Sequence, residues 1–233
     1  FFANEEGDLR RSDGTEAGTF ALGDFHRIIS VDPAGDQIMF RVLQEDNTEE
    51  LWASNGTVAG TYRVTTIRTG ADDLYSKVSA VMGDTYYFVA NDGINGRELW
   101  KSNGTQAGTH MVVDFNTTDP AYEKNIRNFV VFGGALYVSA LGNDGLYGLY
   151  RSEGSASGTQ LIGHVPPIGY SVVVNNKLYL FTREGMGNNE STNVWITDGT
   201  PDGTQLVKEL EAPFGEFSHV IVDDVLYFST TKE

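Results

Sequence analysis

One short turn sequence occurs five times along this chain of 233 residues. In chain order the copies read RSDGTEAGT, ASNGTVAGT, KSNGTQAGT, RSEGSASGT and ITDGTPDGT, and we call them the first to fifth turns. Their first glycines lie 42, 48, 50 and 45 residues apart. A period of this length is typical of repeat proteins such as propellers, in which each repeat forms one small sheet. The repeat therefore limits the fold more than any other feature of the sequence.

A second pattern lies between the turns and consists of two β-rich runs joined by two turn-forming residues. The upstream runs are RIISV, KVSAV, NFVVF, YSVVV and SHVIV, and the downstream runs, each written with its two turn residues, are GDQIMF, GDTYYF, GGALYV, NNKLYL and DDVLYF. Links of Gly, Asn and Asp between such runs favour tight antiparallel hairpins. Together with the repeated turn they predict a meander of four strands, A to D, in which the repeated turn joins strands C and D.

The repeat unit also predicts the fold class. No segment has apolar residues at helical spacing over eleven positions, and the chain contains 27 Gly residues, which disfavour helix. Four-stranded sheets of this size bury both faces only when neighbouring sheets cover them, as in a radial array. We therefore predict an all-β fold, a single five-bladed β-propeller domain over residues 1–233, with four-stranded antiparallel blades and repeats of 42–50 residues.

The two ends of the chain carry complementary halves of a repeat. The chain opens with a C–D pair that lacks a complete A–B hairpin, and it closes with an A–B hairpin that lacks C and D. We predict that the N-terminal C–D and C-terminal A–B strands close the last blade, because a shared sheet leaves no exposed edge. Residues 1–4 (FFAN) resemble a strand B end, FVAN at 88–91, which keeps a second interpretation open. In that interpretation the chain is a piece of a longer repeat array.

The residues of the repeated turn are predicted to be structural. A Gly after Asp or Asn adopts positive φ at low cost, and Ser, Thr and Asp side chains hydrogen-bond to nearby backbone amides. The second Gly of each turn permits another positive φ or a close backbone approach. The structural turn residues are Asp13, Gly14, Asn55, Gly56, Asn103, Gly104, Gly154, Asp198 and Gly199.

Charge and composition narrow the classes of partner. The chain has 16 basic and 32 acidic side chains, a net charge of -16, and no local basic cluster. We therefore expect no binding to nucleic acid, because phosphates would be repelled. No run of eighteen apolar residues occurs, so membrane insertion is not expected either. The absence of cysteine excludes disulfides, thiol catalysis and thiolate zinc sites.

Four aromatic residues occupy matching places in strand C of successive repeats. They are Trp52, Trp100, Tyr150 and Trp195. Such rings stack on sugars, which makes these residues the candidate ligand-binding set. Aromatic side chains also dominate protein cores, so packing between blades is the simpler interpretation.

The loops between strands B and C are rich in oxygen ligands of the kind that calcium prefers. Their candidate metal ligands are Asp46, Asp92 and Asp144. None of the loops has the alternating acidic order of a calcium-binding helix-loop-helix, and Asn-Asp-Gly is also an ordinary turn. We expect no cofactor, and calcium is the one metal for which the sequence offers candidates.

The sequence assigns no catalytic residue. A glycoside hydrolase needs two carboxylates that face each other across a pocket. The candidates by position are Asp32, Asp84, Asp114 and Asp224, and each lies at a turn or strand end where a solvated carboxylate is expected.

The stretches ELWASNGTVAGT and ELWKSNGTQAGT resemble the ELWxxDGT repeat family, which occurs in long bacterial surface and secreted proteins. The resemblance covers the whole chain in five copies. It is weaker at the first turn, where Arg10 replaces the Trp, and at the fourth, where Tyr150, Glu153 and Ser155 depart from the pattern. The family implies export and surface display, and it implies no reaction.

These observations lead to three functional hypotheses. The first is a non-catalytic extracellular binding or adhesion module of a bacterial surface or secreted protein, whose partners are glycans or other surface and matrix proteins. The second is a structural subunit or spacer of a larger cell-surface assembly. The third is a five-bladed glycoside hydrolase.

Overall fold

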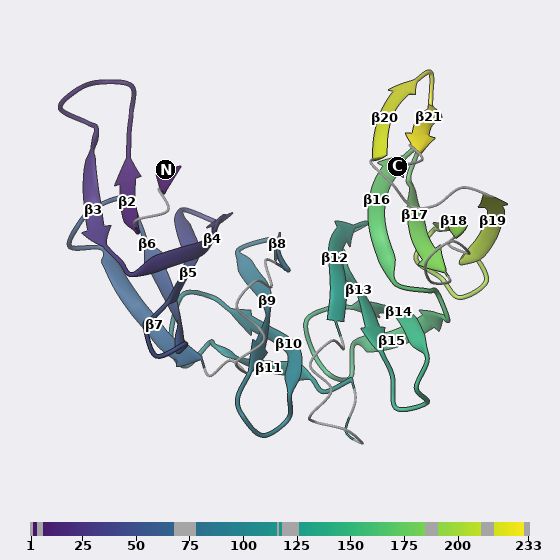
Figure 1. The fold of residues 1–233 in the computed structure, drawn as a ribbon, viewed down its shortest axis with the longest axis horizontal. Helices are drawn as coiled ribbons and strands as arrows, with labels where there is room; N and C mark the ends of the chain where they lie inside the picture. The colour runs from purple at the N-terminus through teal and green to yellow at the C-terminus, as the bar shows by residue number, and fades with distance from the viewer. Residues whose placement is uncertain are drawn as a thin grey trace. The chain divides into compact units, whose positions relative to one another are not determined.

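The structure, a computed structural model, describes residues 2–3, 7–67, 78–115, 117, 126–184, 191–210 and 217–230. Every regular element in these ranges is a β-strand, so the predicted all-β fold is confirmed (Figure 1). No helix in the described part of the chain has the length and apolar character needed to span a bilayer. The chain divides into two compact units, Phe1–Glu123 and Lys124–Glu233.

The first unit contains three antiparallel sheets in which the strands follow one another in chain order. The first sheet has three strands, β1 (Phe2–Ala3), β2 (Asp8–Arg11) and β3 (Phe20–Asp24). The second sheet has β4 (Arg27–Ala34), β5 (Gln37–Leu43), β6 (Glu49–Ser54) and β7 (Thr61–Ile67). The third sheet has β8 (Ser79–Met82), β9 (Thr85–Asn91), β10 (Arg97–Ser102) and β11 (His110–Val113).

The second unit repeats this arrangement. One sheet has β12 (Ile126–Phe132), β13 (Ala135–Leu141), β14 (Tyr147–Ser152) and β15 (Thr159–Gly163). The next has β16 (Ile168–Val174), β17 (Lys177–Glu184), β18 (Ser191–Thr197) and β19 (Gln205–Leu210). A two-stranded sheet of β20 (Phe217–Val222) and β21 (Val225–Thr230) follows. The predicted A–D meander is therefore present in four complete sheets, two in each unit.

The A–B hairpins form at the predicted two-residue turns. Three of them have positive φ at both turn residues, which are Gly133 and Gly134, Asn175 and Asn176, and Asp223 and Asp224. The other two have positive φ only at the first turn residue, at Gly35 (64°) and Gly83 (62°). Asn, Asp and Gly are the residues that reach this region at low cost, which explains why the five turns use no other residue type.

Within each unit, adjacent sheets bury apolar faces against each other. In the first unit, Leu9 of the first sheet packs with Phe40 of the second, and Leu51 of the second packs with Phe88 of the third. In the second unit, Leu149 packs with Leu180 of the next sheet. Burial of this kind explains why strand B is apolar on both faces.

The predicted shared blade is not found in the described residues. Strand β2 pairs with β1 and β3, and β21 pairs with β20, so the N-terminal C–D pair and the C-terminal A–B pair lie in separate sheets. The physical reason is that Phe2–Ala3 already occupies the edge of β2 that a strand B would take. The described strands form no closed sheet, and they do not confirm the count of five blades.

Candidate functional site

The repeated turn closes through hydrogen bonds between side chains and nearby backbone groups. In the second turn, the backbone amide and the hydroxyl of Thr57 both donate to Asn55 Oδ1, at 3.1 and 2.8 Å. The amide of Gly56 donates to Ser54 Oγ at 3.1 Å, and the Ser54 hydroxyl lies 2.7 Å from that of Thr61. The side chains of Ser54 and Asn55 thus accept hydrogen bonds from backbone amides of the turn that have no partner in a β-ladder.

The same network recurs in the other copies. At the first, third and fifth turns the side-chain oxygen is that of Asp13, Asn103 and Asp198, and it accepts both bonds from the Thr two residues later. At the fourth turn Glu153 replaces this residue, and the bond between Ser152 and Thr159 remains at 2.7 Å. The predicted structural role of the turn residues therefore agrees with the hydrogen bonds of the structure.

The two glycines of each turn serve different purposes. The first has positive φ in every copy, at Gly14, Gly56, Gly104, Gly154 and Gly199. The second does not have positive φ. A Cβ on Gly60 would overlap the Asn55 side chain, and a Cβ on Gly108 or Gly203 would overlap the corresponding Asn103 or Asp198. Of the two roles predicted for the second glycine, the structure supports the close approach.

The second, third and fifth turns also contact the sheet that precedes each of them in the same unit. Arg11 donates to the carbonyl of Gly56 at 3.2 Å, and the hydroxyl of Tyr62 donates to the carbonyl of Gly104 at 3.1 Å. In the second unit the Tyr137 hydroxyl lies against Gly199, where a Cβ would not fit. The turn therefore holds neighbouring sheets together as well as closing its own.

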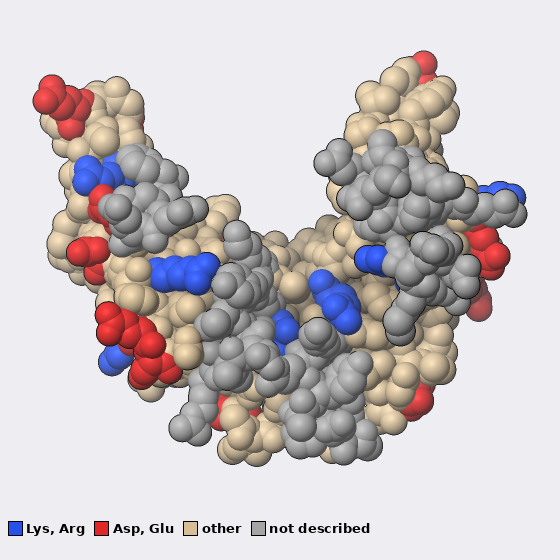
Figure 2. Space-filling view, in the orientation of Figure 1, with Lys and Arg blue, Asp and Glu red and all other residues tan. Residues whose placement is uncertain are grey.

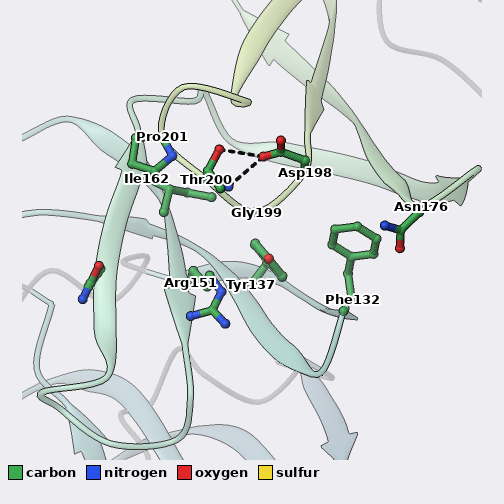
Figure 3. Close-up of a pocket in the computed structure, with 11 residues that line it drawn as sticks. Phe132, Tyr137, Arg151, Ile162, Asn176, Asp198, Gly199, Thr200 and Pro201 are labelled. Carbon is green, nitrogen blue, oxygen red and sulfur yellow. Dashed lines mark hydrogen bonds between the residues drawn. The ribbon is translucent and has the colours of Figure 1, made fainter.

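A cavity of about 640 Å³ opens at this junction in the second unit, between the β12–β15 sheet and the fifth turn (Figure 3). We call it the turn pocket. It is lined by Phe132, Gly133, Tyr137, Arg151, Gln160, Ile162, Asn176, Asp198, Gly199, Thr200 and Pro201. Apolar side chains, hydrogen-bond donors and hydrogen-bond acceptors therefore meet in one concave site.

Two lining residues have fixed and opposite charges. A hydrogen bond from the Thr200 hydroxyl lowers the pKa of Asp198. A hydrogen bond to Glu153, at 2.8 Å from Nη1, raises the pKa of Arg151. Burial raises the pKa of Tyr137, which keeps its phenol protonated. The pocket thus presents a guanidinium, a carboxylate, a phenol and two amides beside the apolar surface of Phe132 and Ile162.

Comparison of the repeats explains why the pocket opens at this junction. In strand D, Gln160 occupies the place that Tyr62 has in the second sheet, where Tyr62 bonds to the third turn. In strand B, Ala135 occupies the place of Gln37, which donates to the carbonyl of Asn103 at 3.4 Å. Gln160 and Ala135 are shorter than these counterparts and leave space open. Tyr137 and Arg151, where the second sheet has Met39 and Ala53, extend to the pocket and add a phenol and a cation.

The predicted aromatic set lies elsewhere. All four residues have the same register in strand C, opposite Phe40, Phe88, Val138 and Leu180. Trp52, Trp100 and Trp195 pack against the apolar clusters between sheets.

The polar atoms of these aromatic side chains differ in their partners. Trp52 Nε1 donates to Glu50 Oε2 at 3.0 Å. Neither Trp100 nor Trp195 has a hydrogen-bond partner for its buried Nε1 among the described residues. Tyr150 contacts the B–C loop at Gly142, and none of the four lines the turn pocket.

The three candidate metal ligands each bond within their own loop. Asp46, Asp92 and Asp144 accept backbone hydrogen bonds from Thr48 at 2.9 Å, Ile94 at 2.8 Å and Leu146 at 3.0 Å. The bond from Thr48 lowers the pKa of Asp46. In the described ranges no three His, Asp or Glu residues gather in a group suited to hold a metal ion. The structure therefore shows three separate Asp-capped turns.

A second cavity, of about 660 Å³, lies in the first unit beside the loop that contains Asp46. We call it the acidic pocket, and it is lined by His26, Gln44, Glu45, Asp46, Thr48, Glu50, Arg63 and Thr66. Burial alone would raise the pKa of Glu50, but hydrogen bonds from Arg63, Trp52 and Gln44 lower it. Glu50 is thus held as a carboxylate by three donors.

Basic side chains are dispersed on the one face that Figure 2 shows. Among the atoms shown in colour in Figure 2, Lys and Arg side chains lie in small separate groups on the visible face. This distribution agrees with the net charge of -16.

No protein-family model and no curated protein matches the chain. Solved structures match it in fold. A GH74 enzyme of Niastella koreensis has a TM-score of 0.57 and 15% identity over 92% of this chain and 36% of its own. The β-propeller domain of the Trilobed protease from Pyrococcus furiosus has a TM-score of 0.52 and 12% identity, with 88% and 64% covered.

TolB from Acinetobacter baumannii is similar at a TM-score of 0.51 and 11% identity, over 85% of this chain and 47% of that one. The chain thus spans less than two thirds of the length of these neighbours. At such identities the similarity concerns the fold alone. These neighbours support a β-propeller fold for the sheets of this chain.

The second glycine of a turn provides a test of the close-approach argument. We expect Gly108→Ala to destabilise the protein by about 1–3 kcal/mol, because the added methyl overlaps Asn103. The adjacent exposed variant Ala107→Gly serves as the control and should cost less than about 1 kcal/mol. Urea denaturation measures both. Equal losses for the two variants would contradict the role of the close contact.

The lowered pKa of Asp198 predicts a pH dependence. Because the folded pKa lies below the ordinary value of 3.8, the stability that Asp198 contributes is present above pH 3.8 and is lost as pH falls through the folded pKa. Asp198→Asn should therefore show a smaller acid-induced drop in the urea midpoint, and Asn103→Asp a larger one. The account fails if neither substitution changes the difference between midpoints at neutral and acid pH.

Proposed function

We propose that this chain is a non-catalytic extracellular binding module of a bacterial surface or secreted protein, and that the turn pocket takes a sugar unit of a glycan. The observation that carries the proposal is the composition of this pocket. Polar groups of both hydrogen-bonding kinds surround an apolar wall that includes Phe132 and Ile162. Ligand sites are typically concave, with a few fixed polar groups on apolar surface.

The chemistry of the lining suits a polyhydroxyl ligand. Arg151 offers donors, Asp198 offers an acceptor, and the amides of Gln160 and Asn176 offer both. Adjacent sugar hydroxyls each need a donor and an acceptor, whereas their C–H faces pack on aromatic and aliphatic surface. Nucleic acid is disfavoured as a ligand because the net charge of -16 repels phosphates.

Localisation and family belong to the same proposal. The five turns support membership of the ELWxxDGT repeat family, which implies surface display. They also support five blades as the count for this propeller-type chain. Other surface or matrix proteins remain the second class of partner, and the glycans they carry would provide the same ligand chemistry.

A structural subunit or spacer is the main alternative, and it has one specific observation in its favour. The repeated turns and three of the four strand C aromatics are used for closing and packing sheets. In this alternative the turn pocket binds no glycan. The sequence resemblance to surface proteins is compatible with both roles.

A glycoside hydrolase is the third candidate, because one structural neighbour is a GH74 enzyme. Glycoside hydrolysis needs a carboxylic acid with a raised pKa beside a second carboxylate. Asp198 is the carboxylate that lines the turn pocket, and its pKa is lowered. Glu50 and Asp46 of the acidic pocket also have lowered pKa values. These carboxylates favour binding over hydrolysis.

A glycan array tests the proposal with a matched pair of variants. Arg151→Met removes the guanidinium from the pocket, and Lys101→Met also replaces a cationic side chain by Met, at the equivalent position of the third sheet and away from the pocket. We expect Arg151→Met to weaken binding at least about tenfold and Lys101→Met to leave it unchanged, because hydrogen bonds to charged groups contribute about 1.5–3 kcal/mol.

The array is run with and without calcium, and release of reducing sugar from bound glycans is measured in parallel. Absence of glycan binding both with and without calcium would contradict the proposal and favour the structural role. Release of sugar would favour the hydrolase.

A further inference from the structure

Two of the five turns contain the dipeptide Asn-Gly, as Asn55–Gly56 and Asn103–Gly104. This dipeptide has a known chemical weakness, since Gly carries no side chain to shield its backbone nitrogen. That nitrogen attacks the Asn Cγ and forms a C–N bond, the Cγ–Nδ2 bond breaks, and the side-chain nitrogen leaves as ammonia with the proton that the Gly nitrogen loses. Water then opens the resulting cyclic imide, at one carbonyl to give Asp and at the other to give isoaspartate. Both side chains are exposed in the structure, so water reaches them.

In the folded turn both reacting groups are already engaged. The attacking group, the Gly56 amide, donates to Ser54 Oγ at 3.1 Å. The group under attack is held by its oxygen, because Asn55 Oδ1 accepts from the amide and the hydroxyl of Thr57. The Asn55 side chain also lies directly against Gly60. The attack removes the proton that the Gly56 nitrogen donates to Ser54, and it changes the geometry at the Cγ whose oxygen Thr57 holds, so it competes with these contacts.

The third turn has the same bonds. Gly104 donates to Ser102 Oγ at 3.1 Å, and Asn103 Oδ1 accepts from the amide and hydroxyl of Thr105 at 3.1 and 2.7 Å. The chain therefore contains two copies of one chemical environment, one of which serves as a control for the other.

The first and fifth turns show the outcome of replacing Asn by Asp. Asp13 Oδ1 accepts from the amide and hydroxyl of Thr15 at 3.0 and 2.7 Å, and Asp198 does so from Thr200 at 2.9 and 2.7 Å. An Asp product thus keeps every bond of the turn. An isoaspartate product does not, because it inserts a methylene into the backbone between the bonded groups.

We infer that Asn55 and Asn103 are deamidation sites and that the folded turn protects them. We also infer that the turn keeps its structure when the product is Asp. Modification then proceeds through local opening of the turn. The folded turn thus protects a dipeptide that is prone to deamidation. Deamidation to Asp adds one negative charge per site, and the connection between strands C and D is kept.

Peptide mapping by mass spectrometry tests the protection. The wild-type chain is incubated in mildly alkaline buffer, once folded and once in urea, and deamidation is followed at both sites. We expect deamidation in the folded chain to be at least about tenfold slower than in the unfolded chain, because in the folded chain it requires local opening of the turn. Equal rates at Asn55 and Asn103 in the two states would overturn the inference.

A single substitution tests the mechanism. Ser54→Ala removes the acceptor of the Gly56 amide and leaves the third turn intact, so deamidation should accelerate at Asn55 and stay unchanged at Asn103. Acceleration at both sites, or at neither, would show that protection is not provided by the local bonds. Asn55→Asp should melt at the same temperature as wild type, and a clear loss would contradict the tolerance of the product.

Discussion

The structure depends on one local interaction, the pair of hydrogen bonds that an Asn or Asp side chain accepts from the Thr two residues later. In the second turn these bonds run from Thr57 to Asn55, and they fix the tight connection between strands C and D. The same turn presents the carbonyl of Gly56 to the preceding sheet, where Arg11 bonds to it, and Tyr62 bonds in the same way to the carbonyl of Gly104 in the third turn. Closure within one sheet and attachment to its neighbour therefore use the same few residues.

Much of the fold could be predicted because its determinants are local. The turn residues at Asn175 and Asn176 require positive φ, and the alternation of turns with β-branched and aromatic runs defines strands by itself. The pairing of the chain ends could not be predicted in this way. Whether β21 or a short N-terminal strand pairs with β2 depends on a competition between distant segments, and Phe2–Ala3 takes that edge in the structure.

The candidate site was hidden from sequence reasoning for a related reason. Repeated residues such as Trp52 and Trp100 attract attention, yet repetition here serves packing between sheets. The turn pocket arises at a strand D position where the copies differ, with Gln160 in the place that Phe20, Tyr62, His110 and Gln205 have in the other copies. Alignment of the five copies shows this difference, but its meaning becomes clear only when the structure shows which strand D residue reaches the next turn.

The central claim is that the turn pocket exists because Gln160 is too short to reach the fifth turn, and that this space binds a glycan. The most direct measurement is the affinity of Gln160→Tyr for the glycan that the wild-type chain binds, together with its melting temperature. The account predicts that the tyrosine fills the pocket as Tyr62 does at the equivalent junction, with binding lost and the melting temperature equal or higher. Retention of wild-type affinity in a folded Gln160→Tyr variant would contradict it.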